Sequence, residues 1–403
     1  MSKHRSPIFL LLRCLFLSVC LTACGGGGGD GGGVNVAAPG VGSGGTGSPI
    51  GSGGTGVSVG PITGFGSIIV NDVHYNIDGI APSIEDASEL KLGMVVRVTG
   101  DATASGDITT GTATSVSAAA ELRGAVGGID VAAGTVDVLG VTVSTDSATV
   151  YDGFMSLSTL GTGQFVQING LPLSSGGLHA TRIEKIATPA ALITTGPIAN
   201  LNTSSTTFKI GSSTVNFGSA TLAGMTSSEL ANGLVVRVRG QLSGSDVVAT
   251  KLQRWQASVA EGAPLSFAGV ISGYTSLSST FTVSDMVVNA SAAAITGGNL
   301  NRLGNGVKVD AEGTLVNGVL QATKLKIRHI PGAGDLPSFS ATGPITQFVS
   351  PSNFKVKGQA IDATQAGVVF VNGTAANLAK SVPVSVIGNQ VVNGVLIATQ
   401  VTF

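Results

Sequence analysis

GMVVRVTG (residues 93–100) and GLVVRVRG (residues 233–240) are two versions of one short pattern that recurs along this chain. In both, valines alternate with arginine or threonine, and a glycine stands at each end. An alternation with period two places the valines on one face, which is typical of a half-buried antiparallel strand. Related segments are GQFVQING (163–170), GNGVKVDAEG (304–313) and SVPVSVIG (381–388). Five related β units are therefore predicted.

Two further signals flank each central strand. Every unit opens with a glycine and a short apolar segment, at Gly60, Gly124, Gly196, Gly269 and Gly343. Every unit closes with an Ala-Thr pair, in TATSV (112–116), HATRI (179–183), VATKL (248–252), QATKL (321–325) and IATQV (397–401). A fixed alanine suits a strand that lies so close to its neighbour that only a small side chain fits. The leucines in SELKLG, SSELANG and LNRLGNG predict a single helical or 3₁₀ turn that plugs one end of each unit.

The size of the unit restricts its fold. About 65–70 residues with five or six short strands are too many for one turn of a β-helix and too few for an immunoglobulin-type sandwich. A small closed or partly closed antiparallel barrel, similar in size to the oligonucleotide/oligosaccharide-binding fold, accounts for this length. The expected fold is all-β, an elongated tandem array of five such barrels joined by short linkers. Their expected bounds are 60–121, 122–188, 194–259, 266–330 and 340–403.

The N-terminus predicts a lipoprotein. Residues 1–23 combine a basic start with an apolar stretch, as in a secretion signal peptide, and Leu21-Thr22-Ala23-Cys24 fits the site at which a cysteine is lipidated. An ordinary signal peptide and a membrane-spanning anchor are the alternatives, but Arg13 and the short apolar length argue against a spanning helix. Residues 24–59 are rich in glycine and serine, which predicts a disordered, flexible tether after the lipidated Cys24.

Gly25 follows the cysteine, and the absence of aspartate there favours the outer membrane of a Gram-negative cell. The protein is expected in the bacterial cell envelope, as an outer-membrane lipoprotein that faces the periplasm or the exterior. No cysteine follows Cys24, so the rest of the chain has neither disulfides nor sulfur ligands for a metal.

The charges are unevenly distributed. Residues 60–187 hold 13 acidic and 5 basic residues, whereas residues 188–403 hold 8 acidic and 13 basic residues. Self-association through these oppositely charged ends would weaken as salt is added, whereas hydrophobic packing between barrels would not.

The sequence resembles a family of uncharacterised bacterial lipoproteins that carry a repeated domain of unknown function, number 5666. GPITGFGSIIVNDVHYN (60–76) and ELKLGMVVRVTG (89–100) carry this resemblance most clearly, and the four later repeats are more divergent. The similarity covers most of residues 60–403. It implies no activity, because the family has none established.

Familiar catalytic motifs lack their structural context. Residues 42–47 match G-x-G-x-x-G and residues 56–60 match G-x-S-x-G, but neither stands in a strand–turn–helix unit. His74, His179 and His329 fall in three different repeats, and we expect each on the surface of a strand. No metal and no cofactor are expected. A hydrolase is kept only as a remote alternative, because few titratable groups are available to converge.

One acidic cluster is the strongest candidate for a cation site. Glu85, Asp86 and Glu89 are close in sequence, with Asp72 and Asp78 upstream. A calcium site is conceivable, since hard cations take several oxygen ligands. The spacing fits no known calcium loop, and a solvated polar loop is favoured.

A basic stripe is the strongest candidate for ligand binding. Lys324, Lys326 and Arg328 share one face of a closing strand, and Lys251 with Arg254, and Arg182 with Lys185, occupy related segments. The stripe suits an acidic or phosphate-rich glycan, and it also suits the ordinary charged face of a strand that resists edge pairing, which we favour. Nucleic-acid binding is not expected, because the chain has one Trp and three Tyr for base stacking.

These observations together predict a cell-envelope protein of structural or interaction type that is not an enzyme. Its expected partners are the membrane, through the lipid on Cys24, and an envelope protein or an acidic glycan. The main alternative is a glycan- or anion-binding module.

Overall fold

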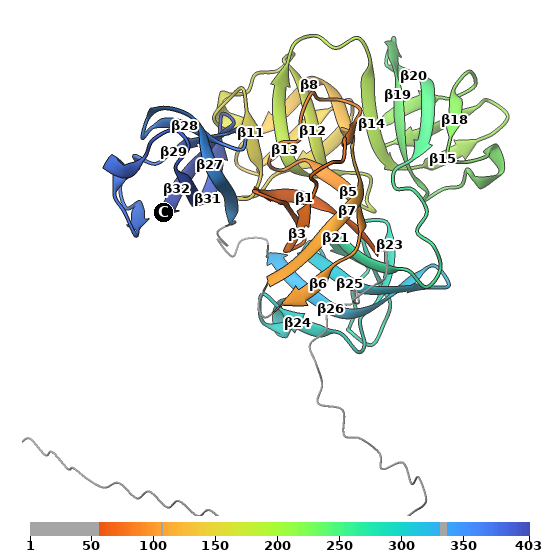
Figure 1. Ribbon diagram of the computed structural model, residues 1–403. Coiled ribbons are helices and arrows are strands. Elements are labelled where there is room, and N and C mark those ends of the chain that lie inside the picture. Colours follow the sequence, from red (N-terminus) through yellow and green to blue (C-terminus); the bar gives the residue numbers. More distant parts are fainter. Residues whose placement is uncertain (1–55, 106–107, 331–336) are drawn as a thin grey trace, which may run out of the picture. The chain divides into compact units, whose positions relative to one another are not determined.

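The computed structural model describes residues 56–105, 108–330 and 337–403 (Figure 1). The expected signal peptide, Cys24 and nearly all of the expected tether lie outside the described residues. The described chain contains 32 strands and four short 3₁₀ turns and has no α-helix. Within it, no helix has the length and apolarity needed to cross a membrane. The chain is therefore all-β and built of repeats.

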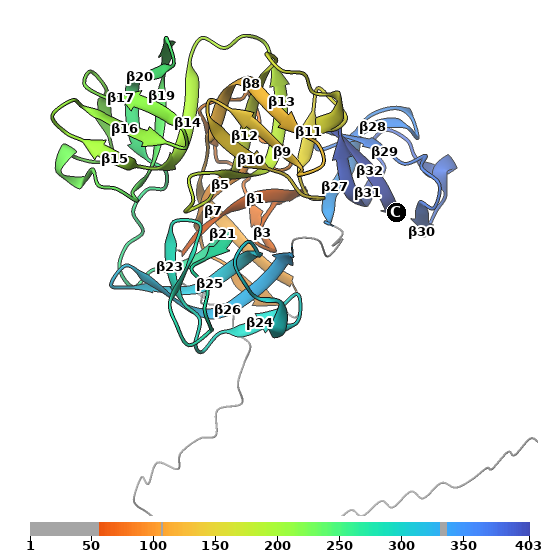
Figure 2. The ribbon, with the colours of Figure 1, turned by 180° about the vertical axis from the view of Figure 1, so that it is seen from behind.

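The second, fourth and fifth repeats follow one order of elements, whereas the first has an additional short strand and no 3₁₀ turn, and the third has an additional short strand. Figures 1 and 2 show the repeats in successive colours. The first comprises β1 (Gly56–Phe65), β2 (Ile68–Val70), β3 (Val73–Asn76), β4 (Ser83–Ile84), β5 (Val95–Gly100), β6 (Thr103–Ser105) and β7 (Ile108–Ala118). The second comprises β8 (Leu122–Asp130), β9 (Thr135–Val138), β10 (Val141–Ser144), β11 (Val150–Asp152), η1 (Leu157–Thr159), β12 (Phe165–Pro172) and β13 (Leu178–Ile186). The third comprises β14 (Leu192–Pro197), β15 (Ala199–Asn202), β16 (Thr207–Ile210), β17 (Ser213–Asn216), β18 (Thr221–Ala223), η2 (Ser227–Glu229), β19 (Val235–Ser243) and β20 (Asp246–Arg254).

The last two repeats have the order of the second. The fourth comprises β21 (Pro264–Ser272), β22 (Phe281–Val283), β23 (Met286–Asn289), β24 (Ala294–Thr296), η3 (Leu300–Arg302), β25 (Lys308–Val316) and β26 (Val319–His329). The fifth comprises β27 (Phe339–Ser350), β28 (Asn353–Val356), β29 (Gln359–Asp362), β30 (Val369–Val371), η4 (Ala375–Asn377), β31 (Pro383–Val392) and β32 (Val395–Thr402).

Strand pairing closes on itself within a repeat. In the fifth, β27 pairs with β28, β28 with β29, β29 with β32, β32 with β31, and β31 with β27. The expectation of a purely antiparallel barrel is wrong, because β29 and β32 are parallel. A ring of five strands cannot alternate in direction all the way round, so one neighbouring pair has to be parallel. The short β30 adds a second parallel partner to β32.

The Ala-Thr pair has the structural role that the sequence predicts. Ala249 faces Gly240 across a β-bulge between β19 and β20, and a Cβ on that glycine would lie 2.2 Å from the carbonyl oxygen of Val248. Thr250 then donates a hydrogen bond of 3.1 Å to the carbonyl of Arg239, beside the bulge. The same glycine–alanine bulge occurs in all five repeats, at Gly100–Ala113, Gly170–Ala180, Gly240–Ala249, Gly313–Ala322 and Gly388–Ala398.

The predicted plugging turn is present in four repeats. SSELANG and LNRLGNG contain η2 and η3, and the prediction is confirmed there. It is wrong for SELKLG in the first repeat, where the backbone bends without forming a 3₁₀ turn. The leucines that follow η1 and η4, Leu160 and Leu378, are buried in the apolar core.

The expectation of five separate barrels on short linkers is wrong. Val57–Val59 of β1 pair in parallel with Leu265–Phe267 of β21, and Gly64 pairs with Ser340 of β27. These pairings join repeats one, four and five into one 19-stranded sheet, and repeats two and three form a 13-stranded sheet. The first strand of an isolated barrel would leave backbone groups unpaired at its ends, and strands of other repeats satisfy them here.

Candidate functional site

Polar side chains on the outer faces of the barrels are buried where repeats meet. In the central strands, Val96, Val98, Val236 and Val238 point into the barrels and are at most 1% exposed, as the alternation predicts. Arg237 points outward and is nevertheless only 5% exposed. Outward-pointing side chains of the central strands thus contact other repeats, and several of them form the candidate site.

Asp86, just after β4, lies at the first of these contacts. Arg239 donates to both of its carboxylate oxygens at 2.7 Å, and Arg123 donates at 2.9 Å. Burial alone would raise the pKa of Asp86, but the hydrogen bond from Arg239 and the nearby arginine charges lower it overall. Glu85 also binds Arg239, at 2.8 Å. In the described residues, no group of three or more acids, histidines or cysteines is arranged to hold a metal ion. In the acidic cluster that the sequence offers as a cation site, the Asp86 carboxylate is bound by Arg123 and Arg239 instead.

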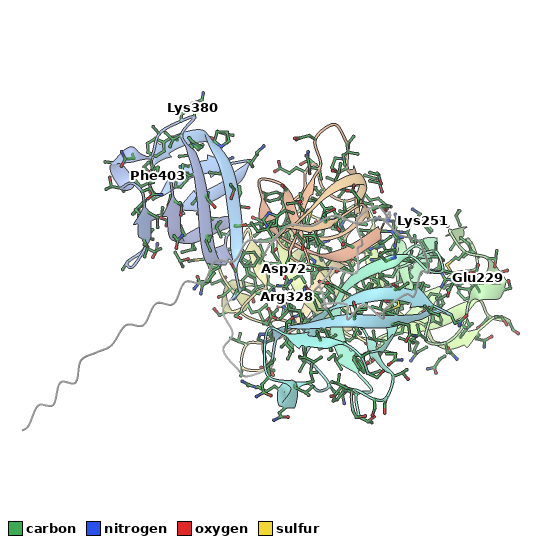
Figure 3. All side chains as sticks on the ribbon, turned by 60° about the horizontal axis from the view of Figure 1, so that its bottom comes forward. Asp72, Glu229, Lys251, Arg328, Lys380 and Phe403 are labelled. Atoms are coloured by element: carbon green, nitrogen blue, oxygen red, sulfur yellow. The ribbon has the colours of Figure 1, made fainter. Side chains whose placement is uncertain are left out.

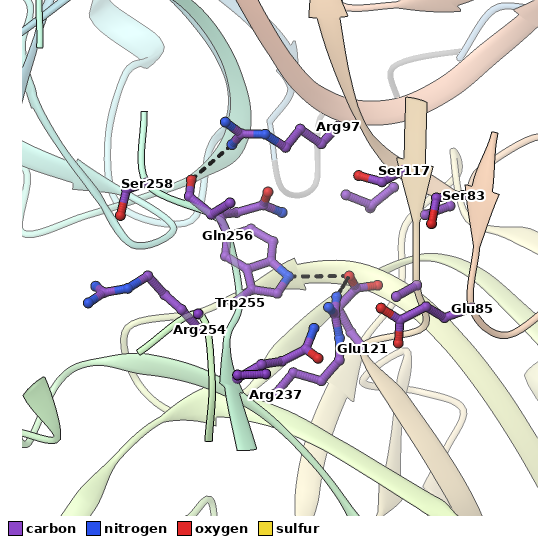
Figure 4. A pocket seen from close by; sticks show the side chains of 17 residues that line it. Ser83, Glu85, Arg97, Ser117, Glu121, Arg237, Arg254, Trp255, Gln256 and Ser258 are labelled. Carbon is purple, nitrogen blue, oxygen red and sulfur yellow. Dashed lines mark hydrogen bonds and ion pairs between the residues drawn. The ribbon is translucent and has the colours of Figure 1, made fainter. Parts of the chain in front are cut away.

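Glu121, at the start of the second repeat, is 1% exposed, which makes it the most buried carboxylate of the described residues. It accepts hydrogen bonds from Arg237 at 3.0 Å and from the indole of Trp255 at 3.2 Å (Figure 4). The backbone N–H of Gly170 donates a third, at 3.0 Å. Burial raises the pKa of Glu121, against the lowering effect of Arg237 and the indole. One carboxylate thus joins the second and third repeats.

Asp146 forms the contact between the second and fourth repeats. It binds the Lys308 ammonium at 2.6 Å and the His179 ring at 3.0 Å. Burial alone would raise the pKa of Asp146, but the His179 hydrogen bond and the Lys308 charge hold it well below its usual range. The expectation that His179 lies on the surface is wrong, because the outer face of β13 packs against other repeats and leaves His179 9% exposed.

Ser144 completes a serine–histidine–aspartate chain that the sequence analysis missed. Its hydroxyl lies 3.2 Å from Nδ1 of His179, whose Nε2 contacts Asp146. A catalytic relay of this kind needs a carboxylate available to stabilise the imidazolium, whereas here Asp146 also neutralises Lys308. Neither Ser144 nor His179 is among the residues that line the adjacent cavity. Ser144, His179 and Asp146 all belong to the second repeat, and the pair of Asp146 with Lys308 joins them to the fourth.

The basic stripe on β26 lies as the sequence predicts, on one face of the strand, and each member contacts a carboxylate. Lys324 lies 3.3 Å from Glu312 on β25, and Lys326 binds Asp72 of the first repeat. Arg328 binds Asp72 at 2.9 Å and also binds Asp310; Figure 3 labels Asp72 and Arg328 side by side. The stripe is thus largely neutralised within the chain, with side-chain exposures between 25% and 37%.

A tight hairpin turn positions Asp72. Asn71 and Asp72 both have left-handed backbone conformations, with φ of 51° and 63°, between β2 and β3. Such a two-residue turn is favoured in hairpins because its twist matches that of the flanking strands. The Asn71 side chain donates to the carbonyl of Val59 and to the hydroxyl of Ser266, which fixes the turn against the fourth repeat.

A cavity of about 910 Å³ adjoins these ion pairs, between the first, second and fourth repeats and the start of the fifth. The three residues of the stripe line it, together with Lys308. Asp72, Asp310 and His74 also line it. The structure therefore brings the predicted residues together in a cavity with carboxylates beside them, and whether they bind a ligand stays a prediction.

The opposite charges of the two halves of the sequence meet within one chain. Among the described residues, acidic residues before residue 188 bind basic residues after it in seven pairs: Asp72–Lys326, Asp72–Arg328, Glu85–Arg239, Glu85–Lys251, Asp86–Arg239, Glu121–Arg237 and Asp146–Lys308. The uneven charge distribution thus has an intramolecular explanation.

Comparison with known proteins identifies the repeats. A domain of unknown function (DUF5666) matches residues 123–184, 195–253, 268–326 and 342–402, which together make up more than half of the chain. The chain belongs to the DUF5666 family. No curated protein and no solved structure matches it.

Each DUF5666 match begins in or near the first strand of a repeat and ends in its last strand. The expectation that residues 60–121 resemble the family most clearly is wrong, since no match covers them. The first repeat differs from the other four in two respects: it has the additional strand β6, and no 3₁₀ turn precedes its central strand.

Sequence reasoning missed Glu121, Asp146 and Lys308. Lys308 stands at the same outward position of a central strand as Arg97 and Arg237, so the alternation itself was a usable signal. A polar residue at this outward position of the central strand in several DUF5666 repeats indicates a surface that contacts another repeat. The residue that it binds in the other repeat stands in no recurring pattern, so the sequence does not reveal it.

Proposed function

We propose that this chain is a lipid-anchored protein of the bacterial cell envelope, of structural or interaction type and without catalytic activity. In this proposal the signal peptide is removed before Cys24, and lipid on that cysteine and a glycine-rich tether hold the repeats at the outer membrane. The repeats are five-stranded barrels of the size of the oligonucleotide/oligosaccharide-binding fold. They present one continuous body to an envelope protein or a glycan.

The ion pairs between repeats carry the proposal of a structural role. The carboxylates of Asp86, Asp146 and Asp72 each bind cations from other repeats, so they serve the cohesion of the chain. A buried pair of this kind is weak evidence for net stability but opposes separation of its partners, because separation leaves an uncompensated charge. Repeats held together in this way suit a structural role, in which the protein keeps one shape.

Lipid anchoring is tested at Cys24. The full chain is expressed in a Gram-negative host that is fed an alkyne analogue of palmitate, and labelled protein is detected by click chemistry. Labelling is expected for the wild type and for the control Cys20→Ser, and its loss is expected for Cys24→Ser. Equal labelling of Cys24→Ser contradicts the anchor.

The location is tested by separating inner and outer membranes on a sucrose gradient. The wild type is expected in the outer-membrane fraction, and Cys24→Ser in the soluble periplasmic fraction. Protease added to intact cells then distinguishes a periplasmic from a surface orientation. Recovery of the wild type with the inner membrane contradicts the proposed location.

A second candidate function is binding of an acidic glycan, which the cavity beside β26 favours. Four cationic side chains line it, and its volume of about 910 Å³ lies within the range of ligand sites. Lys324 is the most exposed member of the stripe and its ion pair is the longest. Lys324→Gln should weaken binding on an array of acidic glycans several-fold, whereas Lys380→Gln, at an exposed position in the fifth repeat, should leave it unchanged. An array without signal contradicts this function.

A further inference from the structure

A second cavity, of about 320 Å³, lies between the first and third repeats and the segment 255–258 that follows β20 (Figure 4). Its wall carries arginine, glutamate, serine and glutamine side chains around Trp255. The volume is at the lower end of the range for small-molecule sites. The cavity is separate from the one beside β26, since the two share no lining residue.

Arg97, on the outer face of β5, stands out among the charges of this cavity. Six of the eight arginines in the described ranges bind a carboxylate. Arg302 has no such partner and is exposed to solvent. Arg97 is partly buried, has no carboxylate partner among the described residues, and makes one hydrogen bond of 3.0 Å, from Nη1 to the carbonyl of Ala257. Burial lowers the pKa of Arg97, and no neighbouring acid offsets this effect.

A second arginine of the wall has an unused donor. Arg237 is 5% exposed and binds Glu121 through Nη2, but its Nε has no hydrogen-bond partner. A guanidinium carries five N–H donors, and a buried donor without a partner costs free energy. A ligand oxygen that reaches these donors would recover that cost.

The composition of the wall limits the ligand. A carboxylate matches the forked N–H groups of a guanidinium such as Arg97. The side chains of Ser83, Ser117 and Gln256 offer partners for hydroxyl groups. Glu85 and Glu121 also line the cavity, so a doubly charged phosphate would be repelled more strongly than a monoanion.

We propose that this cavity binds a small hydroxylated monocarboxylate of the sugar-acid class, with Arg97 holding the carboxylate and the serine and glutamine side chains holding hydroxyl groups. This site does not depend on the proposed lipid anchor or on ligand binding beside β26. The ligand is either a free sugar acid or the acidic end of a glycan chain.

Trp255 provides the readout, since it is the single tryptophan of the chain and lines the cavity. The full chain in detergent is titrated with D-glucuronate at pH 7 while tryptophan fluorescence is recorded, and calorimetry provides a second measurement. Glucuronate is expected to give a saturable change, with glucose and inorganic phosphate at least tenfold weaker. A disaccharide that ends in glucuronate distinguishes the two possible ligands. If it binds as tightly as glucuronate, the ligand is the acidic end of a glycan chain. If it binds at least tenfold more weakly, the ligand is a free sugar acid.

Variants test the assignment of Arg97. Arg97→Gln is expected to weaken glucuronate binding at least tenfold, whereas the control Arg302→Gln retains it. Urea unfolding of each variant checks that the fold is kept. If Arg97→Gln does not fold, the double variant Ser83→Ala/Ser117→Ala, at two exposed positions, takes its place and is expected to weaken binding several-fold. Absence of saturable binding, equal binding of phosphate, or full binding by the variant that folds overturns the proposal.

Discussion

Arg239 binds Asp86 with both terminal nitrogens, each 2.7 Å from one carboxylate oxygen, although the two residues are 153 positions apart in the chain. The arginine belongs to the third repeat, and the aspartate to the first. A bidentate pair fixes orientation as well as distance, and this one is largely shielded from solvent on the aspartate side, where the side chain is 4% exposed. The contact therefore defines how two repeats meet.

Asp86→Asn should destabilise the protein by about 3 kcal/mol, because it leaves Arg239 and Arg123 without their shared carboxylate. The free energy of unfolding is measured by urea denaturation at pH 7. Glu89→Gln, at an exposed position three residues further on, is the matched control and should change the stability by less than about 0.5 kcal/mol. Equal stabilities of the two variants would show that the pair does not hold the repeats together.

Gly240→Ala should cost about 2–3 kcal/mol, since the added Cβ would lie 2.2 Å from the carbonyl oxygen of Val248. Thermal or urea unfolding measures the loss. Gly304→Ala is the control, because a Cβ at that position has open space around it. Comparable losses at both sites would contradict a special need for glycine at the bulge.

The local structure of each repeat was accessible from the sequence, whereas the arrangement of repeats was not. Alternation in GLVVRVRG predicts a strand because inward and outward positions differ within a few residues. The Ala-Thr pair predicts a close strand approach because Ala249 and Gly240 face each other within one hairpin. Pairing of Val57 with Leu265 has no comparable signal, because apolar residues of many strands would fit the same place.

The candidate site was only half predictable for the same reason. The stripe of Lys324, Lys326 and Arg328 follows from its spacing on one strand. Its carboxylate partner Asp72 belongs to a hairpin turn in another repeat, and a charge in a turn looks solvated when only the sequence is known.

The stability of the chain should fall in acid partly through Asp146. The pKa of Asp146 is depressed in the folded state, so its contribution is complete above the ordinary aspartate value of about 3.9 and is lost as the pH falls further. Asp146→Asn should therefore lower stability at pH 7 and flatten the loss between about pH 5 and pH 2. Urea midpoints across this range measure both effects, with the exposed Asp246→Asn as control. An unchanged acid slope in Asp146→Asn would argue against the depressed pKa.

Titration of Glu121 should be visible in the fluorescence of Trp255, whose indole donates to its carboxylate. Burial raises the pKa of Glu121, so the change should occur above the ordinary glutamate value of about 4.3. Since the folded state holds this proton more tightly than the unfolded state, the contribution of Glu121 to stability grows as the pH falls through that range. Glu121→Gln should abolish the fluorescence step, and Glu89→Gln should keep it. A step that persists in Glu121→Gln would assign it to another group.

Because β1 pairs with strands of both the fourth and the fifth repeat, the number of repeats in this chain is fixed by its structure. Gene duplication readily lengthens an array in which each unit touches only its neighbours. Here, gain or loss of one unit in the middle would displace every later unit and break pairings that span more than two hundred residues. A change confined to a loop breaks none of these pairings, so it costs the structure less than a change in the number of units.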